Sequence, residues 1–113
     1  MKIITEKITI DELKIMSEKM FGSLVKAVVD VEKEIMAVDA ELHSDEEKFL
    51  LEDGSKQENL WGINLYPEFN GDDFVEFDSM INLRPSQGNR SRGVEDEKIQ
   101  KKIIAIVNGL VKK

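Results

Sequence analysis

The residues best suited to bind a ligand gather between Ser79 and Val94. All three arginines of the chain, Arg84, Arg90 and Arg92, lie in this segment. Around them stand residues that form hydrogen bonds or tolerate unusual backbone angles, namely Ser86, Gln87, Gly88, Asn89, Ser91 and Gly93. After Leu83 the segment has neither strand nor helix periodicity, so we predict a loop.

This loop leads from the end of a predicted strand to the start of a predicted helix, a position that suits an anionic ligand. We therefore predict a non-catalytic binding or regulatory module for an anionic ligand or an acidic partner surface. The candidate binding residues are Arg84, Ser86, Gln87, Asn89, Arg90, Ser91 and Arg92. The alternative is a purely structural loop, because three acids open the following helix and could pair with the arginines. Without Gly-x-Gly-x-x-Gly or Gly-Lys-Ser, the loop indicates no nucleotide site, and we predict no cofactor.

Acidic residues on one sheet face suggest a different function, a small metal-assisted hydrolase or phosphotransfer-type enzyme. Alternation places Glu76 and Asp78 on the same face of the last strand, with Asn64 beside them, and hard cations prefer such oxygen ligands. A solvated face in which Arg84 pairs with one of these acids explains the pattern equally well. No definite metal ligand set emerges.

His43 is the only histidine and could assist such an enzyme as a base. Asp39 or Glu41 would then orient its ring. The sequence assigns no nucleophile to it, because no Gly-x-Ser-x-Gly elbow is present. A structural role at the start of a helix is the alternative.

The elements that would carry these residues follow the order β-α-β-β-α-β-β-α. Hydrophobic periodicity predicts strands at 2–8, 24–32, 35–42, 60–66 and 74–83, and helices at 10–21, 45–53 and 95–113. Thr9 with Glu12 and Ser44 with Glu47 have the spacing of capping boxes. The short link at 32–34 and the Asn-Gly turn at 70–71 predict two antiparallel hairpins, the second pairing Leu65 with Val75. We expect one domain over 1–113, an α+β two-layer sandwich with the helices on one face of a mostly antiparallel sheet.

Charge and composition restrict the partners. The net charge is -7, divided into -12 over residues 1–83 and +5 over residues 84–113, which argues against indiscriminate nucleic-acid binding. The chain has no cysteine and no apolar run long enough for a signal peptide or membrane span, so we expect a cytoplasmic protein without membrane contact. A monomer is preferred, and a weak homodimer through the edge of 35–42 is the alternative.

Three stretches resemble a known family: Phe-Gly-Ser-Leu-Val-Lys-Ala-Val-Val-Asp-Val-Glu at 21–32, Gly-Ile-Asn-Leu-Tyr-Pro-Glu at 62–68, and the run from Phe77 to Val94. Together they are similar to a family of small, uncharacterised prokaryotic proteins, a domain of unknown function. The resemblance covers nearly the whole chain. It implies no activity, cofactor, partner or functional residue.

Overall fold

An antiparallel sheet of five strands forms the centre of the structure, a computed structural model that describes residues 1–113. Its strands are ordered β1 (Lys2–Ile4), β4 (Ile35–Val38), β3 (Val25–Asp30), β5 (Leu60–Leu65) and β6 (Val75–Glu76). The central pair runs from Val25 opposite Leu65 to Asp30 opposite Leu60. A separate parallel pair joins β2 (Ile8–Thr9) to β7 (Val111–Lys112). The predicted strand 2–8 is thus divided into two, and the predicted helix 95–113 ends at Leu110, before β7.

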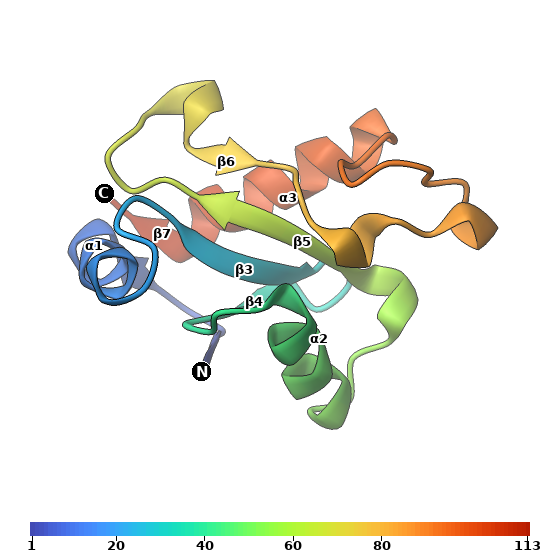
Figure 1. The fold of residues 1–113 in the computed structure, drawn as a ribbon, viewed down its shortest axis with the longest axis horizontal. Coiled ribbons are helices and arrows are strands. Elements are labelled where there is room, and N and C mark those ends of the chain that lie inside the picture. The colour runs from blue at the N-terminus through green and yellow to red at the C-terminus, as the bar shows by residue number, and fades with distance from the viewer.

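Helices cover both faces of this sheet. α1 (Ile10–Lys19) and α3 (Glu97–Leu110) contribute to the larger core, in which Leu13 and Val107 are buried together with Val29 of β3. α2 (His43–Glu52) lies on the opposite face, where Leu50 packs on Val28. In Figure 1, α2 stands in front of the sheet and α3 passes behind it.

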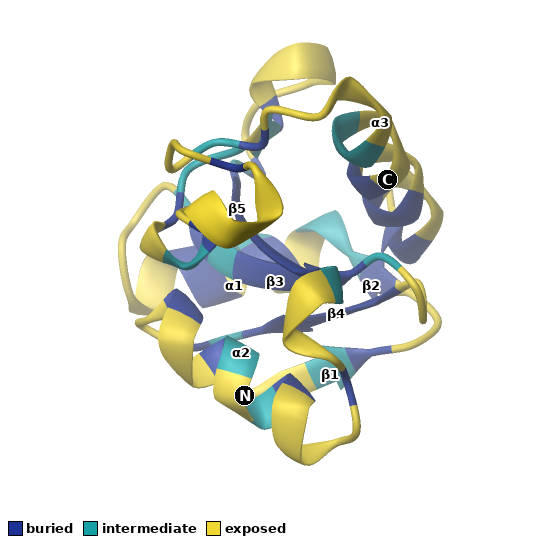
Figure 2. Ribbon diagram, turned by 90° about the vertical axis from the view of Figure 1, so that its right-hand side faces the viewer, coloured by how far each residue is buried: buried dark blue, intermediate teal, exposed yellow.

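The predicted α+β class and the mostly antiparallel sheet are confirmed, but the two-layer arrangement with all helices on one face is wrong. Val28, Ile35 and Ala37 project from the face opposite Val29, and these apolar side chains need cover. α2 and Ile81 supply that cover, which gives three layers. Figure 2 shows the result, with the central strands buried and the outer surfaces of the helices exposed.

The first hairpin is confirmed with shorter strands. Asp30 pairs with Ile35, and the Asp30 carboxylate accepts hydrogen bonds from the amides of Glu32 and Lys33, each at 2.9 Å. Glu34 closes the turn in the left-handed region, with φ of 59°. β1 pairs with the outer side of β4, so the edge offered to the predicted homodimer is already covered within the chain. The oligomeric state stays a prediction.

The second hairpin keeps the predicted register, with Leu65 opposite Val75, but its outer strand ends at Glu76 instead of residue 83. The chain then turns over the sheet in a 3-10 helix, Met80–Asn82. There the Asn82 side chain takes the place of a strand backbone, accepting from Gly62 N at 2.8 Å and donating to Gly62 O at 2.9 Å. Ser79 fills the space above Gly62 that a side chain would otherwise occupy.

The capping residue at each helix start determines whether the first backbone amides of that helix have a hydrogen-bond partner. At α1 the predicted cap is confirmed, since Thr9 Oγ1 accepts from Glu12 N at 3.1 Å. At α2 the predicted Ser44 cap is wrong, because the helix begins at His43 and Leu42 occupies the N-cap position without a side-chain hydrogen bond. α3 is capped by Asp96. No helix combines the length and apolar character needed to cross a membrane.

Replacing Gly62 with Ala should destabilise the protein, because the new Cβ would lie 2.5 Å from Cβ of buried Ser79. We expect the free energy of unfolding in urea to fall by about 1–3 kcal/mol, the usual cost of overpacking. Gly109→Ala is the matched control. It adds the same methyl group in open space on α3 and should raise stability by about 0.5–1 kcal/mol. Equal behaviour of the two variants would contradict the close approach at Gly62.

Candidate functional site

Arg84 anchors the arginine loop instead of facing solvent. The residue is 9% exposed, and its guanidinium donates to the backbone carbonyls of Gln57, at 2.6 Å, and of Leu60. The guanidinium carbon also stacks 4.2 Å from the ring centre of Trp61. Burial lowers the pKa of this group. Arg84 therefore holds residues 84–93 against the start of β5. Its guanidinium contacts carbonyls and the Trp61 ring of the protein itself, so it is not free to bind a ligand.

Asn89 closes the loop from inside. Its buried side-chain amide donates to the carbonyls of Asn82 at 2.7 Å and Gly93 at 2.8 Å, and its side-chain oxygen accepts from Glu95 N at 2.9 Å. The backbones of Arg84 and Asn89 also pair with each other as an isolated bridge. A loop with this internal bonding presents its outer residues in a defined arrangement.

The remaining predicted residues divide between support and surface. Gln87 accepts from Arg84 at 3.2 Å, and Ser91 Oγ accepts from Gly93 N at 3.2 Å, so both help to hold the loop. Ser86 is exposed. Arg90 is also exposed, and its backbone amide donates to the Glu95 carboxylate at 2.7 Å. The structure thus brings the seven predicted residues onto one loop but leaves only part of them facing solvent.

Arg92 lies where the loop meets the sheet and α2. Its Nε donates to Asp78 at 2.7 Å, in an ion pair whose side chains are 56% and 44% exposed. The same arginine lines a cleft of about 150 Å³ together with Lys26, His43, Ser44, Ser79 and Met80. We call this the His43 cleft. It joins residues from β3, the start of α2 and the segment after β6, which are far apart in sequence.

The start of α2 contributes free hydrogen-bond donors to the His43 cleft. Leu42 provides no side-chain cap, and the amides of His43 and Ser44 have no hydrogen-bond partner in the protein. The amides at a helix start carry a partial positive charge and favour anions. The Ser44 hydroxyl, which the sequence assigned to capping, lines the cleft instead.

His43 forms one wall of this cleft and is 8% exposed. Its Nε2 lies 2.8 Å from the carbonyl oxygen of Ile63, so Nε2 carries the proton and Nδ1 is left without a hydrogen bond. The predicted orienting partners, Asp39 and Glu41, do not bond to the ring. Burial lowers the pKa of His43, and the positive charges of Lys26 and Arg92 lower it further.

The acidic residues of the alternative enzyme are engaged in other contacts. Glu76 accepts from the Asn64 amide at 2.8 Å and from the Tyr66 hydroxyl at 2.9 Å, while Asp78 pairs with Arg92. No three acidic or histidine side chains come together in a way that could hold a metal ion. The sheet face therefore offers hydrogen-bonded pairs, and the structure gives the metal-assisted mechanism no specific support.

Glu46 is a fully buried acid beneath the start of α2. Its Oε2 accepts from Ala40 N at 3.2 Å, and its Oε1 has no partner. Burial raises the pKa of this carboxyl from its ordinary 4.5 to about 10. The Glu46 side chain is therefore neutral at physiological pH, and it acts as a packing group with one hydrogen bond.

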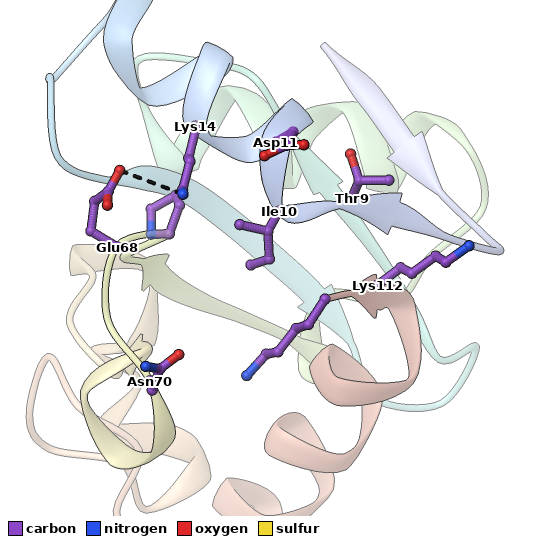
Figure 3. A pocket seen from close by; sticks show the side chains of 9 residues that line it. Thr9, Ile10, Asp11, Lys14, Glu68, Asn70 and Lys112 are labelled. Atoms are coloured by element: carbon purple, nitrogen blue, oxygen red, sulfur yellow. Dashed lines mark ion pairs between the residues drawn. The ribbon is translucent and has the colours of Figure 1, made fainter.

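A larger cleft of about 500 Å³ lies at the start of α1, between β7 and the segment after β5 (Figure 3). Lys14 and Glu68 point toward each other across it, with Nζ and Oε1 3.9 Å apart. Asp11 adds a second acid, and Lys113 lies over the ring of Phe74. Three lysines and two acids line this cleft, and only Lys14 and Glu68 form an ion pair across it. Because cations and carboxylates alternate around an open cleft without a buried polar group, its lining does not favour one class of ligand.

Comparison with known families matches residues 2–110 to a family described as "Protein of unknown function (DUF5674)". The chain belongs to DUF5674. No curated protein and no solved structure matches it. The resemblance inferred from the three sequence stretches is thereby confirmed as membership of a family of unknown function, and the family brings no assigned site.

Sequence reasoning missed part of the site in this DUF5674 chain. Lys26, Ser44 and Ser79 line the His43 cleft but were assigned to a strand face, a helix cap and a strand. Only the Lys26 position carried a signal, because alternation along 24–32 places it opposite Val25 and Ala27, on the sheet face that the cleft shares. The turn after Glu76 and the shifted start of α2 depend on contacts between distant segments, which spacing along the chain does not show.

Replacing Asn89 with Ala should loosen the loop of this DUF5674 chain, because carbonyls that Asn89 now satisfies would lose their buried donor. We expect a loss of about 1–3 kcal/mol in unfolding free energy and faster hydrogen exchange at the amides of Arg84 and Glu95. Asn108→Ala on exposed α3 is the control and should change stability by less than about 0.5 kcal/mol. An unchanged exchange rate in Asn89→Ala would show that the backbone alone fixes the loop.

The raised pKa of Glu46 predicts that stability falls as pH rises. Folded Glu46 keeps a proton that the unfolded chain releases, so its contribution is complete below its ordinary pKa of 4.5 and declines as pH rises toward 10. Glu46→Gln keeps a neutral side chain, and its unfolding free energy should decline less than that of the wild type between about pH 5 and pH 9. Urea titrations at several pH values measure the slopes. Exposed Glu52→Gln should retain the wild-type slope, and the same slope in Glu46→Gln would contradict the assignment.

Proposed function

We propose that this DUF5674 chain is a non-catalytic binding module that recognises an anionic ligand, or an acidic surface of a partner, through the loop of residues 84–93. The observation that carries the proposal is the division of labour within that loop. Arg84 and Asn89 are buried and hydrogen-bonded to backbone groups, which holds the loop in place. Arg90 and Arg92 lie on the exposed surface of that loop. Such preorganisation lowers the entropic cost of binding.

Charge supports the same role. The chain as a whole carries -7, so an anion is repelled by most of its surface and favoured at the positive segment that begins with Arg84. Arg92 faces the His43 cleft together with Lys26, which adds a second cation from β3. A guanidinium that pairs with a carboxylate, as Arg92 does with Asp78, can exchange that exposed partner for a ligand at small cost.

The proposal is specific about which predicted residues bind. Arg90 and Arg92 would contact the anion, with Ser86 and Ser91 available at the loop surface. Arg84, Gln87 and Asn89 would act by holding the loop. The metal-assisted enzyme built on Glu76, Asp78 and His43 stays a prediction without a supporting contact. A cytoplasmic location and a monomeric state are likewise part of the proposal.

The double variant Arg90→Ala/Arg92→Ala tests this function. Its fold should persist within about 1 kcal/mol, because the only side-chain ion pair lost is the exposed one with Asp78. In a thermal-shift screen of inorganic phosphate, nucleotides, organic acids and short RNAs, ligands that raise the wild-type melting temperature should bind the variant about tenfold more weakly or worse.

Lys98→Ala/Lys101→Ala is the matched control, since it removes the same charge from exposed positions on α3. It should bind like the wild type. If both variants lost the same ligand affinity, the effect would come from net charge alone, and the loop would not be the binding site. Unfolding of the arginine variant, or failure of every anion to shift the wild type, would overturn the proposal.

A further inference from the structure

We propose that the His43 cleft is a carboxylate site, and that its ligand carries an apolar group next to the carboxylate. This inference rests on the proposed anion-binding function and names the class of ligand. The chemistry is shared by two sources, a small branched organic acid and the free C-terminus of a polypeptide that ends in an apolar residue.

The charges around the cleft favour a single negative charge. Lys26 and Arg92 bring two positive charges, and Asp78, bonded to Arg92 at 2.7 Å, brings one negative charge. The remaining excess of one positive charge matches a carboxylate better than a doubly charged phosphate. Neutral His43 adds no charge, since burial keeps its pKa low.

The donors that line the cleft are of the kind that bind a carboxylate. The unpaired amides of His43 and Ser44 lie at the start of α2, and Ser44 has a hydroxyl without a partner. Lys26 Nζ lies 5.0 Å from the centre of the Phe21 ring and has no acid bonded to it. These donors come from two different elements that line the same cleft, and a carboxylate has two oxygens with which to accept from them.

Size excludes large anions. A volume of about 150 Å³ corresponds to about five water molecules at the volume each occupies in the liquid. A carboxylate with one or two carbons fills much of that space, whereas a nucleotide does not fit. The rest of a larger ligand would have to lie outside, over the rim of the cleft.

That rim is apolar. Leu42 is 53% exposed and Met80 is 62% exposed, and both line the cleft beside Ile81. Large apolar side chains with this exposure gain free energy when another apolar group covers them. Met80 lies on the 3-10 turn above Gly62, and its flexible side chain can adapt to the shape of a ligand. A branched hydrocarbon group next to the carboxylate would meet this rim.

Titrations of the wild-type protein followed by amide NMR test the assignment. The probes are 4-methylvalerate for the small acid and N-acetyl-leucine for a polypeptide C-terminus. Acetate lacks the apolar group, 4-methylvaleramide and N-acetyl-leucinamide lack the charge, and inorganic phosphate carries a higher charge. Saturable shifts at the amides of His43, Ser44 and Met80 are expected with the two apolar carboxylates, about tenfold weaker binding with acetate, and none with the amides.

Two variants separate the parts of the site. Met80→Ser should weaken the apolar carboxylates about fivefold and leave acetate unchanged, because only hydrocarbon contact is lost. Lys26→Gln should weaken every carboxylate while the exposed loop arginines are retained. The better of the two apolar probes identifies the source of the natural ligand.

The inference is overturned if phosphate binds the cleft more tightly than the apolar carboxylates, or if Met80→Ser binds them as the wild type does. Anion-dependent shifts confined to Arg90 and Arg92, without any at His43 and Ser44, would overturn the cleft while leaving the loop function intact. Absence of shifts at both places would overturn the loop function as well.

Discussion

The contact between Gly62 and the segment above it governs the arrangement of the site. Gly62 lacks a side chain, so Ser79 can approach the sheet, and the Asn82 amide then satisfies both backbone groups of Gly62. A single side chain thereby replaces the next strand of the sheet at this point. Without that replacement the buried N–H and C=O of β5 would be unpaired, at a cost comparable to a lost hydrogen bond for each group.

The replacement of a strand by the Asn82 side chain also positions the His43 cleft and the arginine loop. Because the chain leaves the sheet after Glu76, it crosses above β5 and reaches the start of α2, where Ser79 and Met80 complete the His43 cleft. Asn82 also donates to the carbonyl of Arg92 at 2.9 Å, and Ser79 N donates to the same carbonyl, so the turn positions the arginine loop directly. The binding residues are thus fixed by the same bonds that end the sheet.

Local patterns predicted what local forces determine. The β3–β4 hairpin, the Thr9 cap and the register of Leu65 with Val75 were correct, because alternation and capping act over a few residues. The face covered by α2 was not predicted, although Val28, which alternates with Lys26 and Asp30 along β3, was a sign of burial on both faces. The sequence does not predict the burial of Arg84, because an arginine in a donor-rich loop has the same sequence pattern whether its partners are ligands or backbone carbonyls far along the chain.

The parallel pairing of β2 with β7 has a consequence for how the protein is made. Ile8 pairs with Val111, and Lys7 donates to the carbonyl of Gly109. The partners in both contacts are thus separated by about a hundred residues of sequence. Ile8 is buried in the folded core, which also contains residues of α3 and β7. It therefore cannot become buried during synthesis until those two elements have been made. Contacts of such long sequence separation form slowly and after closure of a large loop. The burial of Ile8 is therefore one of the last steps by which the core is completed.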